Sequence, residues 1–448
     1  MYRLLIKTVL VQRITMKYYS LNHNSTPTDF QTAVRAGLAP DRGLYFPETI
    51  PRLEADFLTS LKDFSIAEMC FRAIKPYIGT DIPEDTLYKI VAETLAFDFP
   101  IKSIEDQIGA LELFHGPTLA FKDVGARFMA RCLGYFNTQK EQKKLTVLVA
   151  TSGDTGGAVA DGFLGVEGID VVILYPKGKV SAIQEKQLTT LGRNITAIEV
   201  DGVFDDCQDM VKNAFLDEQI KEVRPLTSAN SINVARWLPQ MFYYFIAVRD
   251  LQERNENLVF SVPSGNFGNI CAGMMAQQMG LGISHFIASN NKNDAVVDYL
   301  NNGIYEPKKT IATISNAMDV GAPSNFIRIQ KIVNNDLTRL RKLLSGFSYS
   351  DSDTREALKK LYSTYDYIAD PHGAVGYLGL LDYLKEQSQP TYGVFLETAH
   401  PVKFVDVVED TIKTEVSLPE SIQELVQKEK KSIEITNYEG LKSYLINN

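Results

Sequence analysis

One lysine of this chain has neighbours that could make its amine reactive. Lys122 directly follows the apolar residues 119–121, and apolar residues at helical spacing continue behind it to Met129. An exposed lysine is a solvated ammonium with a pKa near ~10.4, whereas a lysine among apolar side chains loses basicity and can act as a Schiff-base nucleophile. Lys122 is therefore a candidate nucleophile, with an ordinary surface lysine at a helix start as the alternative.

Two polar, glycine-rich loops each follow a predicted buried strand. The strands are Leu145–Ala150 and Leu258–Val262, and the loops are 151–157 and 263–269, each followed by a helical pattern. Neighbouring N–H groups in such a loop, together with the start of a helix, attract anions. Neither loop is the dinucleotide fingerprint or a P-loop. Glycines can also serve only to allow a tight turn, but the carboxyl ends of parallel strands are where α/β sheets bind ligands.

The lysine and the two loops together indicate pyridoxal phosphate. One loop could hold the cofactor phosphate and the other an anionic substrate, and no metal-ligand pattern competes. A third strand, predicted at Tyr392–Leu396, is followed by Thr398. A hydroxyl partner leaves a pyridine nitrogen largely unprotonated, whereas a carboxylate would protonate it. The other interpretation of Thr398 is an ordinary helix N-cap.

The composition argues against several classes of protein. A net charge of −9 provides no basic surface, so neither nucleic acid nor an anionic membrane is expected as a partner. No run approaches ~20 consecutive apolar residues, so no membrane-spanning helix is expected. The four cysteines form no Cys-x-x-Cys pair and the five histidines no His-Glu-x-x-His pattern. This usage predicts no metal site and a cytoplasmic location.

The elements that must position these residues alternate along an α/β chain of two or three domains. Helices are predicted at Asp29–Ala36 and Ile66–Ile78, and further strands at Val171–Tyr175 and Ile195–Val200. The expected segments are an extension or mis-assigned start at 1–15, with Met16 as the alternative start, an N-terminal domain at 16–97, a catalytic core at 98–415 with a smaller α/β subdomain at about 130–235, and a tail at 416–448 that packs on the core. The charged run Lys428–Lys431 in the tail is interpreted as a solvated helix face.

Several longer motifs, in order along the chain, resemble those of one family. They are Ala36–Pro47, Phe114–Asp123, Ser152–Gly156, Ser264–Asn269, Ser315–Asn325, Asp370–Ala374 and Glu397–Pro401. Together they resemble the threonine synthases, which are fold-type-II pyridoxal-phosphate enzymes. The resemblance implies an α/β fold similar to the β chain of tryptophan synthase, with parallel-sheet domains and a small helical N-terminal domain.

The resemblance also implies a reaction and roles for individual residues. O-phospho-L-homoserine and water would give L-threonine and phosphate, with Lys122 forming the Schiff base with the cofactor and then moving the Cα and Cβ protons. The cofactor phosphate would lie against Gly265, Asn266, Phe267, Gly268 and Asn269, and its pyridine nitrogen against Thr398. The candidates for holding the substrate are Ser152, Asp154 and Thr155, with Thr118 and Arg236 as further ones.

One residue departs from the wider fold-type pattern. Asp154 occupies a position where fold-type-II enzymes usually carry an asparagine that bonds the phenolic oxygen of the cofactor. A carboxylate there would repel a phenolate unless it is protonated or turned away. The threonine synthases that this chain resembles share the aspartate.

Two other readings of the function stay open at this point. Another enzyme on the same scaffold, such as a threonine or serine dehydratase or a synthase that uses phosphoserine, would need fewer or different anion sites. An inactive homologue that binds a phosphorylated metabolite should have lost the lysine or its loops, and this chain retains both. The partner is expected to be a small-molecule substrate, and the chain a monomer or homodimer.

Overall fold

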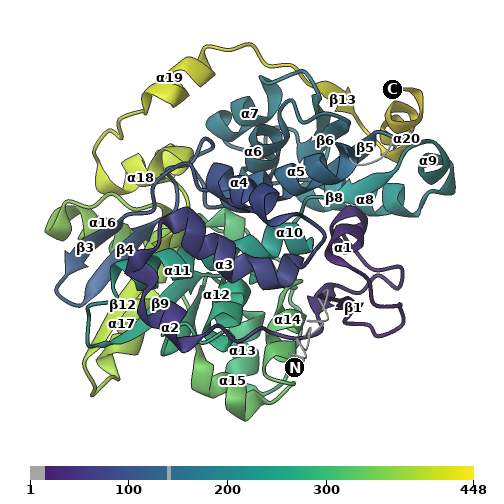
Figure 1. The fold of residues 1–448 in the computed structure, drawn as a ribbon. Helices are drawn as coiled ribbons and strands as arrows, with labels where there is room; N and C mark the ends of the chain where they lie inside the picture. The colour runs from purple at the N-terminus through teal and green to yellow at the C-terminus, as the bar shows by residue number, and fades with distance from the viewer. Residues whose placement is uncertain (1–15, 139–142) are drawn as a thin grey trace, which may run out of the picture.

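Two sheets of mostly parallel strands lie side by side, and the predicted loops leave their carboxyl edges (Figure 1). The computed structural model describes residues 16–138 and 143–448, so the expectation for residues 1–15 concerns a segment outside the described part. The larger sheet has the order β11-β10-β9-β12-β4-β3, in which only β3 runs antiparallel to its neighbour. Its strands are β3 (Ile101–Glu105), β4 (Ile108–Glu112), β9 (Asn257–Pro263), β10 (His285–Asn290), β11 (Leu344–Ser348) and β12 (Thr391–Glu397).

The smaller sheet has the order β13-β7-β6-β5-β8 and is parallel throughout. Its strands are β5 (Leu145–Ala150), β6 (Ile169–Pro176), β7 (Ile195–Val200), β8 (Leu226–Ser228) and β13 (Ile433–Ile435). Val147 and Val149 of β5 face one hydrophobic cluster, and Leu148 faces another on the opposite side. Because both faces are buried, the strand is a continuous apolar run rather than an alternating one.

Helices cover both faces of each sheet. Around the larger sheet lie α11 (Met241–Asp250), α12 (Gly268–Gln278), α13 (Ala295–Asn302), η3 (Asn316–Met318), α14 (Phe326–Ile332), α15 (Leu337–Leu343), α16 (Asp351–Tyr365), α17 (Pro371–Lys385), η4 (Pro401–Phe404) and α18 (Val405–Ile412). Around the smaller sheet lie α5 (Lys122–Thr138), α6 (Asp154–Phe163), α7 (Ala182–Thr189), α8 (Phe204–Leu216), α9 (Glu218–Val223), α10 (Val234–Trp237), η2 (Leu238–Gln240), α19 (Glu420–Val426) and α20 (Tyr438–Asn447).

The helices of the N-terminal unit pack against helices of both sheets, with α3 on α11 and α4 on α5. It contains β1 (Tyr18–Ser20), α1 (Phe30–Ala36), β2 (Tyr45–Pro47), α2 (Ala55–Thr59), η1 (Leu61–Asp63), α3 (Ile66–Ile78) and α4 (Glu84–Thr94). Helix α3 begins where the Ser65 side chain accepts from the Glu68 N–H and ends at Gly79, whose φ of 62° suits glycine. Its buried residues recur at helical spacing and join the main core.

Most elements predicted from the sequence are confirmed. The predicted helix at Ile66–Ile78 is α3, and the predicted strands Leu145–Ala150 and Ile195–Val200 are β5 and β7 with the same bounds. The remaining predicted strands and helices agree with the structure to within a few residues. These segments carry strong local signals, because a buried strand or an amphipathic helix is written in contiguous sequence.

The prediction for the charged run Lys428–Lys431 is right in that most of the run is exposed, but wrong in that the run is not helical. Helix α19 ends at Val426, and the run is irregular chain in which the Lys430 ammonium lies 2.8 Å from both Glu185 and Glu199. The chain must leave the helix here because β13 follows and pairs with β7 along the edge of the smaller sheet. The tail therefore adds a strand, β13, and a helix, α20, to the smaller sheet.

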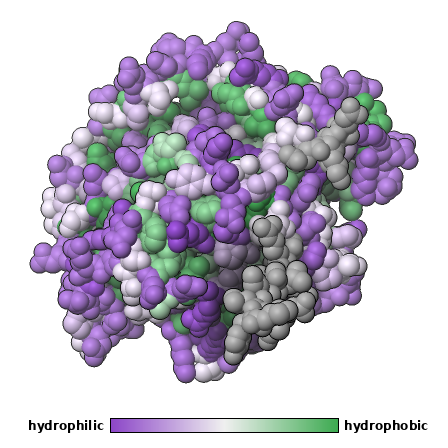
Figure 2. All heavy atoms as spheres, viewed as in Figure 1, coloured by the Kyte–Doolittle hydropathy of each residue, from purple (hydrophilic) through white to green (hydrophobic). Residues whose placement is uncertain are grey.

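The face of the molecule seen in Figure 2 is mainly hydrophilic. Hydrophilic side chains cover most of the face in Figure 2, and hydrophobic ones show mainly between them. Among the described residues, no helix combines the length and apolar character needed to cross a membrane.

The tail should contribute measurably to stability. Leu441 of α20 is fully buried beneath the smaller sheet, so Leu441→Ala should leave a cavity and lower the free energy of unfolding by about 2–5 kcal/mol. Ile446 on the same helix is 37 % exposed, so Ile446→Ala should cost about 0.5 kcal/mol or less. Chemical denaturation of both variants checks this, and equal losses would contradict the packing described.

Candidate active site

The chain around Lys122 is fastened to the end of strand β12 by backbone hydrogen bonds. Phe121 N–H donates to the Thr398 carbonyl at 2.9 Å, and His400 N–H donates to the Leu119 carbonyl at 3.0 Å. Ala120 and Ala399 form an isolated β-bridge between these bonds. Lys122 is the first residue of α5, so the pairing fixes its position against Thr398 at the carboxyl edge of the larger sheet.

Lys122 is desolvated and faces a carboxylate. Its side chain is 17 % exposed, and its Nζ lies 3.5 Å from Oδ2 of Asp154. Burial lowers the pKa of Lys122, the Asp154 carboxylate opposes this, and the ammonium of Lys403 lowers it further. The structure thus provides the setting for a reactive amine that the sequence predicted.

Asp154 is held as an ionised carboxylate. Its Oδ1 accepts from Lys403 Nζ at 2.8 Å and from Gln184 Nε2 at 2.9 Å, while Oδ2 faces Lys122. Burial alone would raise the pKa of Asp154, but the two ammonium groups outweigh burial and hold the pKa well below its usual range. Protonation is therefore not how the site accommodates an aspartate here.

Lys403 is the residue of this site that the sequence analysis missed. Its side chain is fully buried, and its Nζ contacts Oδ1 of Asp154 and the Thr118 carbonyl, each at 2.8 Å. It belongs to the short helix η4, two residues beyond the recognised motif Glu397–Pro401. The available signal was a single lysine between the apolar residues Val402 and Phe404, a setting that suggests burial. A buried lysine almost always has a charged or hydrogen-bonding partner.

The loop after β5 is the glycine-rich turn at the carboxyl edge of the smaller sheet. The Thr151 hydroxyl accepts from the N–H groups of Gly153 and Gly156 at 3.0 and 2.9 Å, which shapes the start of α6. Gly153 has a φ of 140°, and a Cβ there would come within 2.4 Å of Gln184. Ser152 and Thr155 are half-buried and make no side-chain hydrogen bond within the described residues, so both hydroxyls are available to a ligand.

The loop after β9 forms the corresponding turn on the larger sheet. A Cβ on Gly265 would lie 2.7 Å from Cα of Met318, so only glycine lets the segment around Met318 pack against the loop. Asn266 is fixed from two sides, because its Nδ2 donates to Ser231 at 2.6 Å and its Oδ1 accepts from the Ser324 N–H at 2.6 Å. Phe267 adopts a left-handed conformation with φ of 59°, and α12 begins at the next residue, Gly268.

Asn269 presents an unsatisfied donor beside this turn. Its Oδ1 accepts from the Tyr244 hydroxyl at 2.7 Å, whereas its Nδ2 is buried and has no partner among the described residues. A buried amide without a partner is costly, so the arrangement fits a site whose acceptor comes with a ligand. The converging loop, the helix start and this amide suit a phosphate group, so the residues present fit the phosphate of pyridoxal phosphate.

A buried arginine supports the loop after β9 from behind. Arg328 donates to the Tyr45 and Ile232 carbonyls at 3.0 and 2.6 Å, and to Oδ1 of Asn325 at 2.6 Å. Asn325 in turn donates to the Asn266 carbonyl at 3.0 Å. Burial lowers the pKa of Arg328 only to about 10, so it stays charged and ties the N-terminal unit to the loop.

Thr398 lies at the site and does not cap a helix, so the N-cap interpretation is wrong. His400 takes that role, since its side chain accepts from the Val402 N–H at the start of η4. Next to Thr398, burial raises the pKa of Glu397 well above its ordinary value, and the neighbouring Asp370 raises it further. The Glu397 carboxyl fills the space that a Cβ on Gly373 would need, which explains the glycine of the motif Asp370–Ala374.

Thr118 and Arg236 are occupied by internal contacts. The Thr118 hydroxyl donates to Asp123, whose pKa burial raises to about 6. Arg236 is buried against α5, close to Gly125, with Nη1 donating to the Ala229 carbonyl at 2.9 Å. Its Nε is buried without a partner among the described residues.

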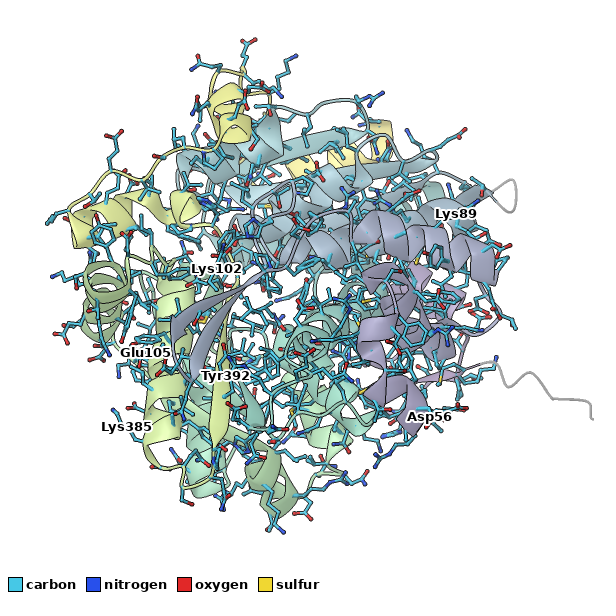
Figure 3. The ribbon with its side chains drawn as sticks, turned by 60° about the vertical axis from the view of Figure 1, so that its left-hand side comes forward. Asp56, Lys89, Lys102, Glu105, Lys385 and Tyr392 are labelled. Carbon is cyan, nitrogen blue, oxygen red and sulfur yellow. The ribbon has the colours of Figure 1, made fainter. Side chains whose placement is uncertain are left out.

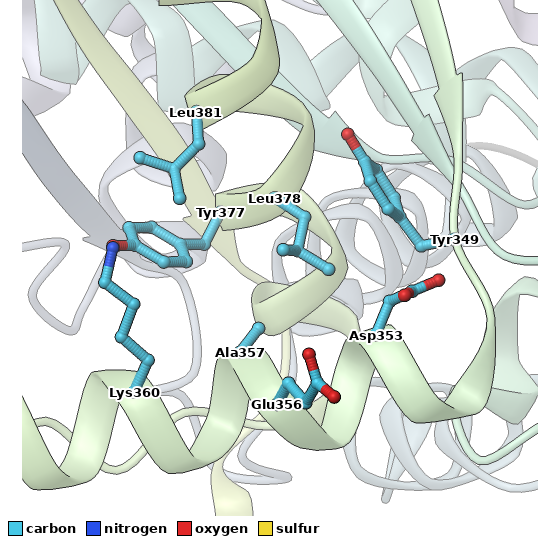
Figure 4. Close-up of a pocket in the computed structure, with 8 residues that line it drawn as sticks. All are labelled: Tyr349, Asp353, Glu356, Ala357, Lys360, Tyr377, Leu378 and Leu381. Atoms are coloured by element: carbon cyan, nitrogen blue, oxygen red, sulfur yellow. The ribbon is translucent and has the colours of Figure 1, made fainter.

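Two further cavities lie away from Lys122. The first is about 240 Å³ and lies between α16 and α17, where the Lys360 ammonium lies over the Tyr377 ring (Figure 4). The second, about 620 Å³, lies between η1 and the loop after α11 and is lined by residues such as Lys62 and Arg254. Neither includes the lysine or a glycine-rich loop, so neither is the candidate active site.

Three family models match the chain, and together they cover most of it. The model described as "Pyridoxal-phosphate dependent enzyme" matches residues 105–397, which cover both loops and Lys122. The model "Threonine synthase N terminus" matches residues 17–95, and "Threonine synthase, C-terminal" matches residues 373–445.

Individual relatives agree with the family models. The chain is 45 % identical to the threonine synthase of Haemophilus influenzae, with 96 % of this chain and all of that one covered. It is 42 % identical to the threonine synthase of Escherichia coli, with 91 % and 94 % covered. The solved threonine synthase of E. coli superposes with a TM-score of 0.90 at 41 % identity, with 96 % of this chain and 100 % of that chain covered. The solved threonine synthase of Brucella melitensis, with pyridoxal phosphate bound, also superposes with a TM-score of 0.90, at 33 % identity, with 96 % of this chain and 99 % of that chain covered. The chain therefore belongs to the threonine synthase family of fold-type-II, pyridoxal-phosphate-dependent enzymes.

Proposed function

We propose that this chain converts O-phospho-L-homoserine and water into L-threonine and phosphate, with Lys122 as the residue that binds pyridoxal phosphate covalently. The observation that carries the proposal is the desolvated Lys122 amine, fixed at the carboxyl edge of the larger sheet beside two anion-binding turns. The cofactor brings one phosphate, and the substrate brings a carboxylate and a phosphate. A site with two turns that favour anions suits this combination.

In this proposal the protein holds the cofactor and the substrate, and it transfers protons. Pyridoxal phosphate, when bound, supplies an electron sink next to the substrate's Cα. Lys122 then moves the protons at Cα and Cβ, because a lysine of lowered pKa gives up its proton more readily than an exposed lysine and so can act as both base and acid. Loss of phosphate from Cγ, transfer to Cγ of the proton taken from Cβ, which makes the methyl group, and addition of water at Cβ complete the reaction. The Gly265–Asn269 loop and Thr398 would orient the cofactor.

The substrate is held, in this proposal, by the turn on the smaller sheet. Ser152 and Thr155 have free hydroxyls at the start of α6, where the helix end favours an anion. Thr118 and Arg236 are further candidates. Thr118 would have to share its hydrogen bond to Asp123, whereas Arg236 has an Nε without a partner among the described residues. Asp154 lies next to the substrate in this proposal, and its contacts with Lys122 and Lys403 are what it contributes there.

A dehydratase is the other candidate on this scaffold. The solved threonine deaminase from Solanum lycopersicum shares the fold at a TM-score of 0.54, but at 16 % identity this likeness concerns the fold alone. The family models for the N- and C-terminal parts favour the synthase. We further propose a cytoplasmic enzyme, monomeric or homodimeric, that acts on a small molecule and not on nucleic acid, in keeping with its net charge of −9.

Replacing Lys122 should remove both cofactor attachment and turnover. Lys122→Ala should abolish the Schiff-base absorbance at about 410–420 nm and reduce phosphate release from O-phosphohomoserine at least about 10³-fold. The control is Lys102→Ala, which changes an exposed lysine on edge strand β3 (Figure 3) and should retain both signals. Ketoacid production without phosphate release by the unmodified protein would instead support a dehydratase.

The free amide of Asn269 should contribute to cofactor affinity. Asn269→Asp keeps an oxygen for Tyr244 but replaces the unpartnered donor with an anion, so the dissociation constant for pyridoxal phosphate should rise at least about tenfold. Tyr244→Phe, which removes only the hydroxyl on the other side of the amide, should change it much less. Absorbance titration measures both, and an unchanged constant in Asn269→Asp would remove this residue from the phosphate site.

A further inference from the structure

Three charged side chains meet in the buried part of the site. Asp154 of α6 lies between Lys122 of α5 and Lys403 of η4, with one oxygen facing each ammonium. The two contacts are unequal, because Oδ1 of Asp154 is 2.8 Å from Lys403 and Oδ2 is 3.5 Å from Lys122. Gln184 adds a hydrogen bond on the Lys403 side, at 2.9 Å.

This asymmetry matters for the reactivity of Lys122. A carboxylate facing Lys122 alone would stabilise its ammonium and so oppose formation of the free amine that attacks an aldehyde or accepts a proton. Lys403 and Gln184 both bond Oδ1, so the negative charge of Asp154 is already compensated before Lys122 is considered. The Lys403 ammonium also bonds the Thr118 carbonyl, which leaves it little freedom to move away.

We propose that Lys403 is a positioning residue that holds the Asp154 carboxylate toward itself and thereby keeps the Lys122 amine available for Schiff-base formation and proton transfer. The proposal rests on Lys122 being the reactive lysine, as argued above. It also explains how the chain tolerates an aspartate at position 154, since the residue comes with its own buried counter-ion.

Replacing Asp154 and replacing Lys403 should shift the pKa of Lys122 in opposite directions. The groups that act on it are Asp154, Lys403 and, from α10, Arg236, and the Phe121 ring lies 5.5 Å from its Nζ. Asp154 and Lys403 together carry no net charge. Lys403→Met leaves one negative charge and should raise the pKa of Lys122; Asp154→Asn leaves one positive charge and should lower it. The double variant is again neutral and should return the pKa of Lys122 toward that of the unmodified protein.

Competitive labelling of the cofactor-free full chain with trace acetic anhydride measures this directly. The extent of acetylation at each lysine, followed by peptide mass spectrometry over a range of pH, gives the pKa of Lys122. At neutral pH we expect Lys122 labelling to slow by about tenfold in Lys403→Met, since one pH unit of pKa is a factor of ten. It should become faster in Asp154→Asn and close to the original rate in the double variant. Lys89 and Lys102, both exposed, provide internal references (Figure 3).

A matched control separates this effect from the loss of any ion pair. Lys430→Met removes a lysine that bridges Glu185 and Glu199 on the smaller sheet and should leave Lys122 labelling unchanged. If Lys403→Met does not fold, Asp154→Asn and the double variant still isolate the Lys403 charge, because the double variant buries no unpaired charge. Lys122 should then label more slowly in the double variant than in Asp154→Asn.

Thermal unfolding adds a second readout from the same four proteins. Each single variant removes one partner of the buried Asp154–Lys403 pair, so the melting temperature of the double variant should exceed the additive expectation. The proposal is overturned if the pKa of Lys122 is the same in all four proteins, or if both single variants shift it in the same direction. Labelling requires neither substrate nor cofactor, so an inactive enzyme that shows the expected shifts would count against the proposed function alone.

Discussion

Burial of charge beside Lys122 is the constraint on which the site depends. A lysine reacts as an amine only when desolvation lowers its pKa, yet a buried charge is costly unless it is paired. The structure meets both demands by placing Asp154 between Lys122 and Lys403 and by bonding the carboxylate mainly to Lys403 and Gln184. The three charges come from α5, α6 and η4, so their meeting requires both sheets to be in place.

The motifs of the family contact one another in the folded chain, and these contacts explain several of their residue types. The chain before Lys122 pairs with the residues that follow β12, the segment around Met318 closes on Gly265, and Gly373 leaves space for the buried carboxyl of Glu397. His372 connects two of these motifs, because its ring accepts from the Ala317 N–H while also contacting Asp370. Gly265 and Gly373 therefore mark close approaches between segments distant in sequence, rather than flexibility.

The parts of this arrangement that the sequence predicts are local. Strand β5, helix α3 and the two polar glycine loops are each encoded in a continuous stretch, and their order indicates which strand ends meet. What sequence reasoning missed depends on contacts across the fold: the fully buried Lys403, the bond from Gln184 to Asp154 and the addition of β13 to the smaller sheet. The run Lys428–Lys431 shows the same limit: its exposure could be predicted, but the contacts of Lys430 with Glu185 of α7 and Glu199 of β7 could not.

An acidic protein that binds a phosphorylated substrate must create positive potential locally. The net charge of −9 resides on the chain as a whole, while α6 and α12 start at the two glycine loops and direct their positive ends there. Asp154 occupies the first turn of α6, where the helix end stabilises a carboxylate, and Lys403 balances its remaining charge. The site can therefore contain an ionised aspartate and still attract anions, because the N–H groups of the two loops and of the helix starts are left to bind them.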